Sequence, residues 1–154
     1  MLTSIIMAAE QPKKDTTWFT GEVQHEGFPL LLRFPKKPDF DTLQIQYPRL
    51  VIVTHQLEKV KPSGLPEADY NDSLEDMDQD IITSFPAGIA VLVETFGGRR
   101  TYYIYTTASA TVEEAKRKIA TKYPKARLEW KASDDPNWRL IRGYSEDYHF
   151  YKKG

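Results

Sequence analysis

The residues best suited to bind a charged partner lie in one acidic stretch. Between positions 62 and 98 the chain carries eight carboxylates and no lysine or arginine. Within that stretch Asp72, Asp76 and Asp80 are spaced four apart, so on a helix they share one face, and Glu75 lies beside them. Such a row is self-repelling. It is typical of a solvated face, of a docking face for a basic protein, or of a weak divalent-cation site.

Each of these interpretations requires different residues elsewhere in the sequence. A solvated face would complement the basic residues of the segment 116–122 within the same fold. A dedicated cation site would add backbone carbonyls or a bent loop, and neither is evident in the sequence. We therefore predict no metal site and no cofactor, and we take Asp72, Asp76, Asp80 and Glu75 as candidate contacts with a protein partner.

The histidines do not form a recognisable catalytic or zinc motif. His25, His55 and His149 lie far apart in the sequence and lack the spacing of a helical zinc site. The chain has no cysteine, which excludes a thiol nucleophile and a cysteine zinc site. We assign no catalytic residue. If the protein is an enzyme of unrecognised type, His55 at the end of a predicted strand is the first residue to test.

The segment Arg99–Tyr105 combines two arginines with three tyrosines, residue types that RNA-binding sheets use to stack on bases. Their order differs from that of the RNA recognition motif, and the facing strand Leu50–Thr54 has no aromatic residue. We expect Tyr102 and Ile104 to point to one side of the sheet, and Tyr103 and Tyr105 to the other.

The elements that would position these residues follow from the pattern of apolar residues. Strands are predicted at Leu50–Thr54, Ile89–Phe96, Arg99–Thr106 and Arg127–Lys131, with a tight hairpin at Gly97–Gly98. A stripe at helical spacing predicts one helix between Glu67 and Phe85; its members are Tyr70, Leu74, Met77, Ile81 and Phe85. A second helix should start at a capping box formed by Thr111 and Glu114, and end before Pro124.

The order strand, helix, strand, strand, helix, strand predicts an α+β fold of the ferredoxin-like split βαβ type, with two helices on one face of the sheet. Residues 18 to 34 predict an N-terminal β-hairpin that either extends the sheet or packs beside it. We expect residues 1–16 to be a flexible N-terminal segment and residues 17–154 to form a single domain. The aromatic tail after Trp138 predicts that Trp138 is buried.

Composition narrows the class of protein further. The chain has 154 residues and a net charge of -1, so it lacks the overall basic charge of many nucleic-acid-binding proteins. No apolar run approaches the roughly 20 residues that a membrane-spanning helix needs. We expect a cytoplasmic protein that contacts neither nucleic acid nor membrane.

Several motifs resemble a bacterial family called domain of unknown function 695. They are Gly64-Leu65-Pro66, the acidic helix, Gly98-Arg99 followed by Tyr102-Tyr103, and Asp135-Pro136 with Trp138. The segment Arg139–Tyr144 departs from the usual family ending. The family has no established activity and supplies no catalytic residues. Its members sometimes accompany domains similar to the ribonuclease E inhibitor B regulator, and this resemblance implies a regulatory binding protein.

From these observations we expect a non-catalytic, protein-binding or regulatory module, with a homodimer as one possible assembly. Two alternatives stay open: an unrecognised enzyme that uses His55 or the acidic helix, and a binder of single-stranded RNA. A deep polar pocket with perturbed carboxylates would favour the enzyme.

Overall fold

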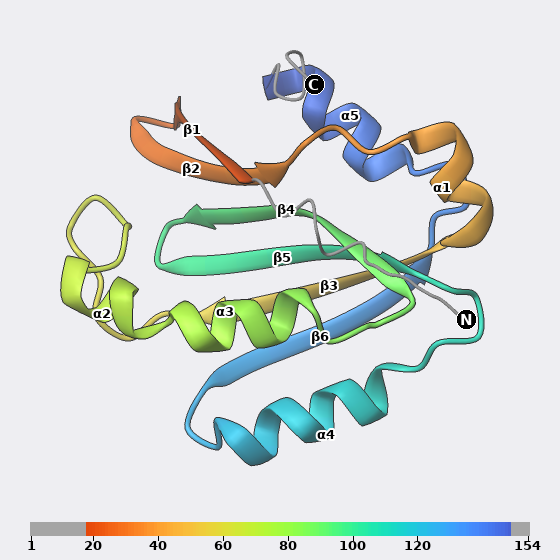
Figure 1. Cartoon of the computed structure of the whole chain (residues 1–154). Coiled ribbons are helices and arrows are strands. Elements are labelled where there is room, and N and C mark those ends of the chain that lie inside the picture. Colours follow the sequence, from red (N-terminus) through yellow and green to blue (C-terminus); the bar gives the residue numbers. More distant parts are fainter. Residues whose placement is uncertain (1–17, 149–154) are drawn as a thin grey trace, which may run out of the picture.

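The computed structural model describes residues 18–148, so the expectation for residues 1–16 lies outside the described residues, as does His149. Six strands form one antiparallel sheet in the order β1-β2-β4-β5-β3-β6 (Figure 1). Their bounds are β1 Trp18–His25, β2 Phe28–Pro35, β3 Arg49–Gln56, β4 Gly88–Phe96, β5 Arg99–Thr106 and β6 Arg127–Asp134. All four strands predicted from residue 50 onward are therefore present.

Two tight turns fix the hairpins of this sheet. Glu26 and Gly27 join β1 to β2 with φ of 54° and 85°, and Gly97 and Gly98 join β4 to β5 with φ of 59° and 82°. Positive φ at both central residues is the geometry of a primed turn, whose twist matches that of the strands. Both predicted hairpins are confirmed, and the first extends the sheet because β2 pairs with β4.

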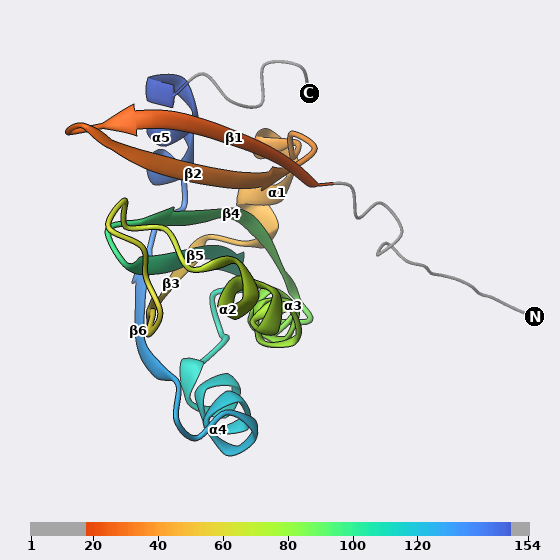
Figure 2. The same cartoon turned by 90° about the vertical axis from the view of Figure 1, so that its left-hand side faces the viewer.

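Five helices are described: α1 Phe40–Gln46, α2 Ala68–Ser73, α3 Glu75–Ile82, α4 Val112–Lys122 and α5 Arg139–Tyr148. Figure 2 shows α2, α3 and α4 together on one side of the sheet. Their apolar side chains share one buried cluster with strand residues such as Val53, Tyr102 and Ile104. The prediction that the helices on either side of the β4-β5 hairpin cover one face is confirmed.

The helix predicted between Glu67 and Phe85 is in fact two helices that meet at Leu74. Three consecutive residues before the break, 71–73, are Asn, Asp and Ser, whose side chains compete for backbone hydrogen bonds. Ser73 donates from Oγ to the Tyr70 carbonyl at 2.6 Å. The apolar stripe continues across the break, and Leu74, Met77 and Ile81 all face the core.

The start of α4 also differs in detail from the prediction. The helix follows Thr111 as expected, but the Thr111 side chain makes no capping hydrogen bond. Glu114 instead lies 4.0 Å from Lys118, one turn further along. The predicted capping box is therefore not formed. Burial of Ala115 and Ile119 against the sheet holds this helix in place.

The opposite face of the sheet is covered in part by α1 and α5, whose side chains Phe40, Leu43 and Ile141 pack with strand residues such as Leu32 and Tyr105. Trp138 is fully buried there, and its ring stacks on Tyr105 with centroids 4.1 Å apart. Its indole nitrogen donates to the Tyr47 carbonyl at 2.7 Å. The Asp135 carboxylate accepts from the backbone nitrogens of Arg139 and Leu140, which starts α5. The predicted burial of Trp138 is confirmed.

Candidate functional site

A charged pair is buried beneath α2 and α3. Asp78 and Arg100 are 8% and 3% exposed, and Nη1 of Arg100 lies 2.8 Å from Oδ2 of Asp78. The guanidinium also donates to Oγ1 of Thr95 at 3.0 Å and to Oδ1 of Asn71 at 2.6 Å. The Tyr102 hydroxyl donates to the second oxygen of Asp78. Burial and the Asp78 carboxylate raise the pKa of Tyr102 well above its usual value, so its proton is retained.

His55 lies directly beside this pair. It faces Arg100 across β3 and β5, is 2% exposed, and its Nδ1 has no hydrogen-bond partner among the described residues. Burial is the largest influence on its pKa and lowers it from 6.5; Asp78 and Glu58 raise it, and Arg100 lowers it. The net direction is downward, which favours the neutral imidazole at neutral pH.

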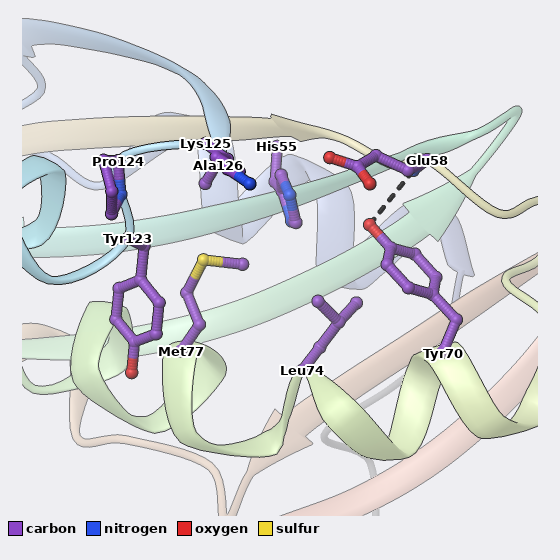
Figure 3. A pocket seen from close by; sticks show the side chains of 9 residues that line it. All are labelled: His55, Glu58, Tyr70, Leu74, Met77, Tyr123, Pro124, Lys125 and Ala126. Atoms are coloured by element: carbon purple, nitrogen blue, oxygen red, sulfur yellow. Dashed lines mark hydrogen bonds between the residues drawn. The ribbon is translucent and has the colours of Figure 1, made fainter.

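His55 also lines a pocket of about 270 Å³ between α2–α3 and the turn from α4 to β6, which we call the His55 pocket (Figure 3). Its lining is mostly apolar and consists of His55, Glu58, Tyr70, Leu74, Met77, Tyr123, Pro124, Lys125 and Ala126. In Figure 3 the imidazole projects between Met77 and Tyr123 on one side and Leu74 on the other. The Tyr70 hydroxyl accepts from the Glu58 backbone nitrogen at 3.0 Å, which fixes one end of the pocket.

The structure separates the predicted acidic row into two kinds of residue. Asp80 accepts from Nζ of Lys122 at 2.8 Å and from the Tyr123 hydroxyl at 2.6 Å. These hydrogen bonds lower the pKa of Asp80. The negative charge of Asp80 is therefore paired with a basic residue of α4 inside the same fold.

The other three residues predicted to contact a partner protein have no cationic side chain paired with them among the described residues. Asp72 belongs to α2, whereas Glu75 and Asp76 belong to α3, and all three are exposed. Glu67 and Asp69 are exposed nearby. No ion pair joins these five carboxylates to another described residue. We call them the acidic surface: Glu67, Asp69, Asp72, Glu75 and Asp76.

The tyrosines of β5 belong to the core and do not form a platform for bases. Tyr102 and Ile104 pack on the side of α3 and α4, and Tyr103 and Tyr105 pack on the opposite side, as predicted. None of the three tyrosines is more than 9% exposed. Burial, followed by the Glu94 carboxylate, raises the pKa of Tyr103.

Part of the second sheet face carries a groove of about 330 Å³ that α5 does not fill. Its lining is mixed and consists of Ile52, Thr54, Glu94, Phe96, Arg99, Thr101, Tyr103 and Glu129. Over residues 18–148, no group of three or more His, Asp or Glu side chains is arranged to hold a metal ion. In the same range no helix has the length and apolar character needed to cross a membrane.

The buried pair was not predicted from the sequence, although two signals for it are present there. Asp78 follows Met77 within the apolar stripe of α3, so it lies at the edge of the buried face. Arg100 alternates in phase with Tyr102 and Ile104, so its side chain points into the same layer. A carboxylate and a guanidinium both assigned to one buried layer predict an ion pair.

Comparison with known proteins gives one family and no individual relative. Neither the curated proteins nor the solved structures include a significant match to the chain. A family model described as "family of unknown function (DUF695)" matches residues 39–144. The match begins at the N-cap of α1 and ends within α5, so it contains the His55 pocket and the acidic surface but excludes the β1-β2 hairpin. The chain belongs to the family of unknown function DUF695.

Proposed function

We propose that the protein is a non-catalytic binding module and that its partner, a protein with a basic surface, docks on the acidic surface. The observation that supports this most directly is the contrast within one acidic stretch. Asp78 and Asp80 have cationic partners inside the fold, whereas the five carboxylates of the acidic surface have none among the described residues. Concentrated like charge destabilises the helices that carry it and steers partners of opposite charge.

We also propose that residues 49–134 form a ferredoxin-like unit to which the hairpin and α5 are added. The support is the strand order β6-β3-β5-β4, with every neighbouring pair antiparallel and with helical crossovers between β3 and β4 and between β5 and β6. The cytoplasmic location and a possible homodimer stay predictions.

Affinity capture with matched variants tests the proposed function. The test variant is Asp72→Asn, Glu75→Gln and Asp76→Asn together; the control is Glu22→Gln, Glu113→Gln and Glu146→Gln, which removes the same charge at exposed positions elsewhere. We expect wild type and control to retain one basic protein that the test variant loses. Equal capture by all three forms would contradict the assignment of the surface.

Cation binding is the main competing use of the acidic surface. A site for calcium or magnesium would raise the melting temperature in millimolar metal by mass action, and a chelator would reverse it. We expect no such shift, because no three of the His, Asp and Glu side chains in residues 18–148 are arranged to hold a metal ion. A shift of several degrees that disappears in the test variant would assign the surface to a metal.

An enzyme that uses His55 is the second candidate function. The observation in its favour is the unpartnered Nδ1 of His55 beside a pocket. The two oxygens of the nearby Asp78 carboxylate accept from Arg100 and Tyr102, and Nδ1 of His55 has no partner among residues 18–148, so the imidazole lacks the orienting carboxylate that a catalytic histidine usually has. This supports binding over catalysis.

A further inference from the structure

We propose that two copies of the chain pair along β1, the strand at one edge of the sheet, so that their two sheets become one. The pairing is antiparallel, and its two-fold axis passes between the Gly21 residues of the two copies. The proposal does not depend on the proposed function, because it uses β1, whereas the acidic surface lies on α2 and α3 and at the N-terminus of α2.

The outer edge of β1 is open within the described part of the chain. β1 is the last strand of the sheet and pairs only with β2, over all eight of its residues and without a bulge. No other segment of residues 18–148 makes a backbone hydrogen bond to it. Figure 2 shows the strand at one end of the sheet. Such an edge presents a row of backbone donors and acceptors that a further strand completes.

The two edges of the sheet differ in their protection against such pairing. The opposite edge strand, β6, carries four charged side chains in eight residues: Arg127, Glu129, Lys131 and Asp134. β1 has the same length, and its only ionisable side chains are Glu22 and His25. It also has no lysine and no proline, residues by which edge strands avoid association. Of the two edges, β1 is therefore the one suited to pair with another strand.

Gly21, in the middle of β1, is not required by the fold of one chain. Its φ is not in the left-handed region, and an added Cβ would lie 3.8 Å from Cε1 of Phe34, which is an ordinary contact. Glycine inside a strand weakens it and often marks a place where a second backbone approaches closely. A two-fold axis beside Gly21 supplies that second backbone.

The side chains of β1 favour a second copy as the partner and select the register. A two-fold axis normal to the sheet keeps equivalent faces together, so odd-numbered residues oppose odd-numbered ones. With Gly21 opposite itself, Phe19 meets Val23 of the second copy on the side of α1 and α5. The Phe19 side chain, 49% exposed in one chain, would be covered by this contact. On the other side Thr20 meets Glu22 of the second copy.

The neighbouring registers are less favourable. A shift by one residue per chain in one direction places Glu22 opposite Glu22 of the second copy, and like charges directly opposite each other destabilise a strand pair. The shift in the other direction places Phe19 opposite Gly21, so the contact between Phe19 and Val23 is lost. The register with Gly21 at the axis avoids both costs.

Sedimentation equilibrium of the full chain measures the dimer. Wild type should pass from monomer to dimer as its concentration rises from low micromolar towards millimolar. Phe19→Ser should raise the dissociation constant about tenfold, because two symmetric contacts with Val23 are lost. Phe28→Ser is the matched control, since Phe28 is 50% exposed but belongs to β2, and it should leave the constant unchanged. A wild type that stays monomeric at every concentration, or equal effects of the two variants, would overturn the proposal.

Charge at Thr20 tests the register without touching the core, because this side chain is exposed. Thr20→Lys places a lysine opposite Glu22 of the second copy and should strengthen the dimer about threefold or more. Thr20→Glu places two carboxylates opposite each other and should weaken it by a similar factor. Weakening by both substitutions is the result expected if Thr20 opposes itself, and it would contradict the proposed register.

Disulfide trapping tests the position of the axis. The wild-type chain has no cysteine, so a single introduced cysteine can link only two copies. Gly21→Cys should be trapped rapidly under mild oxidation, because opposed strand residues have Cα atoms about 4.5–5.5 Å apart, within the range of a disulfide. Gln24→Cys is the control, since Gln24 opposes Trp18 of the second copy and the two cysteines would lie about 20 Å apart. Equal trapping of both variants, or no trapping of Gly21→Cys, would exclude pairing along β1.

Discussion

Arg100 is the residue on which the buried polar contacts converge. It joins β5 to α3 through Asp78, to α2 through Asn71, and to β4 through Thr95. Such a pair is weak evidence for net stability, because removing two charges from water offsets much of their attraction. Its loss is different, since one charge would stay buried without a counter-ion. The pair therefore fixes how α2 and α3 sit on the sheet.

The first prediction concerns this pair. Asp78→Asn should lower the free energy of unfolding by about 3–5 kcal/mol, because it leaves the Arg100 guanidinium buried and uncompensated. Urea denaturation followed by circular dichroism measures the loss. Glu129→Gln, at an exposed pair 3.9 Å from Lys131, is the control and should change stability by less than about 1 kcal/mol. Similar small losses in both variants would contradict the account of Arg100.

The second prediction follows from the lowered pKa of His55. Its folded-state pKa lies below the unfolded value of 6.5, so the unfolded chain binds more protons as the pH falls past 6.5. Wild type should therefore lose stability relative to His55→Gln between pH 6.5 and pH 5, while the difference between them stays constant near pH 8. Denaturation curves across this range measure it, and a difference that grows in the opposite direction would refute the assignment.

At the level of single residues, the sequence predicted which side chains carry charge on a helix surface, but not which residues they contact. The carboxylates Asp72 and Asp76 could be assigned to a helix surface from spacing alone. The pairing of Asp80 with Lys122 depends on how α3 packs beside α4, and no local pattern contains that distance. The pocket at His55 likewise arises from segments distant in the sequence, since its walls include both Tyr70 and Tyr123.

The loop before α2 packs closely against the turn between β4 and β5. Gly64 has a φ of +95°, and a Cβ added there would lie 3.0 Å from the Gly97 backbone nitrogen. The Gly64 carbonyl accepts from the Gly98 nitrogen at 2.8 Å. Gly64 before Leu65 and Gly98 before Arg99, two glycines far apart in the sequence, therefore meet in space.

The third prediction tests that contact. Gly64→Ala should lower the free energy of unfolding by about 1–3 kcal/mol, because alanine strains a positive φ and meets the neighbouring backbone. Gly143→Ala is the matched control: it lies in α5, nothing lies within 4 Å of the position that its Cβ would take, and the change should raise stability by up to about 1 kcal/mol. Thermal unfolding of both variants gives the comparison, and equal effects would rule out the contact as the cause.

The fourth prediction concerns α5, the element that closes the second face. Trp138→Ala should lower the free energy of unfolding by on the order of 3 kcal/mol, because it opens a cavity beside Tyr105 and removes the bond to Tyr47. Ile45→Ala, at a side chain 80% exposed, should change it by less than about 0.5 kcal/mol. An unchanged melting temperature for Trp138→Ala would contradict the burial.

Periodicity predicted element types better than element ends. The stripe from Tyr70 to Phe85 gave the buried side correctly, since all its members face the core, but it could not show the break at Leu74. Helix α5 was not assigned because its start depends on Asp135, whose carboxylate caps it from a preceding turn. The aromatic content of the tail indicated burial without specifying the element.

Across the whole molecule, the two sheet faces differ in what they leave accessible. The face under α2, α3 and α4 has its buried cluster and, at one border, the His55 pocket. The acidic surface lies on the same helices that form one wall of that pocket. The α+β class and the antiparallel sheet could be predicted from the alternation of elements, whereas this juxtaposition of charge and cavity required the structure.

The binding of the captured basic partner at increasing salt concentration tests the central claim most directly. Isothermal titration should give an affinity that falls steadily as salt rises for wild type and for the control carrying Glu22→Gln, Glu113→Gln and Glu146→Gln. In the variant with Asp72→Asn, Glu75→Gln and Asp76→Asn, the affinity should be lower at low salt and nearly independent of salt. The same affinity and the same salt dependence in all three proteins would contradict a docking role for the acidic surface.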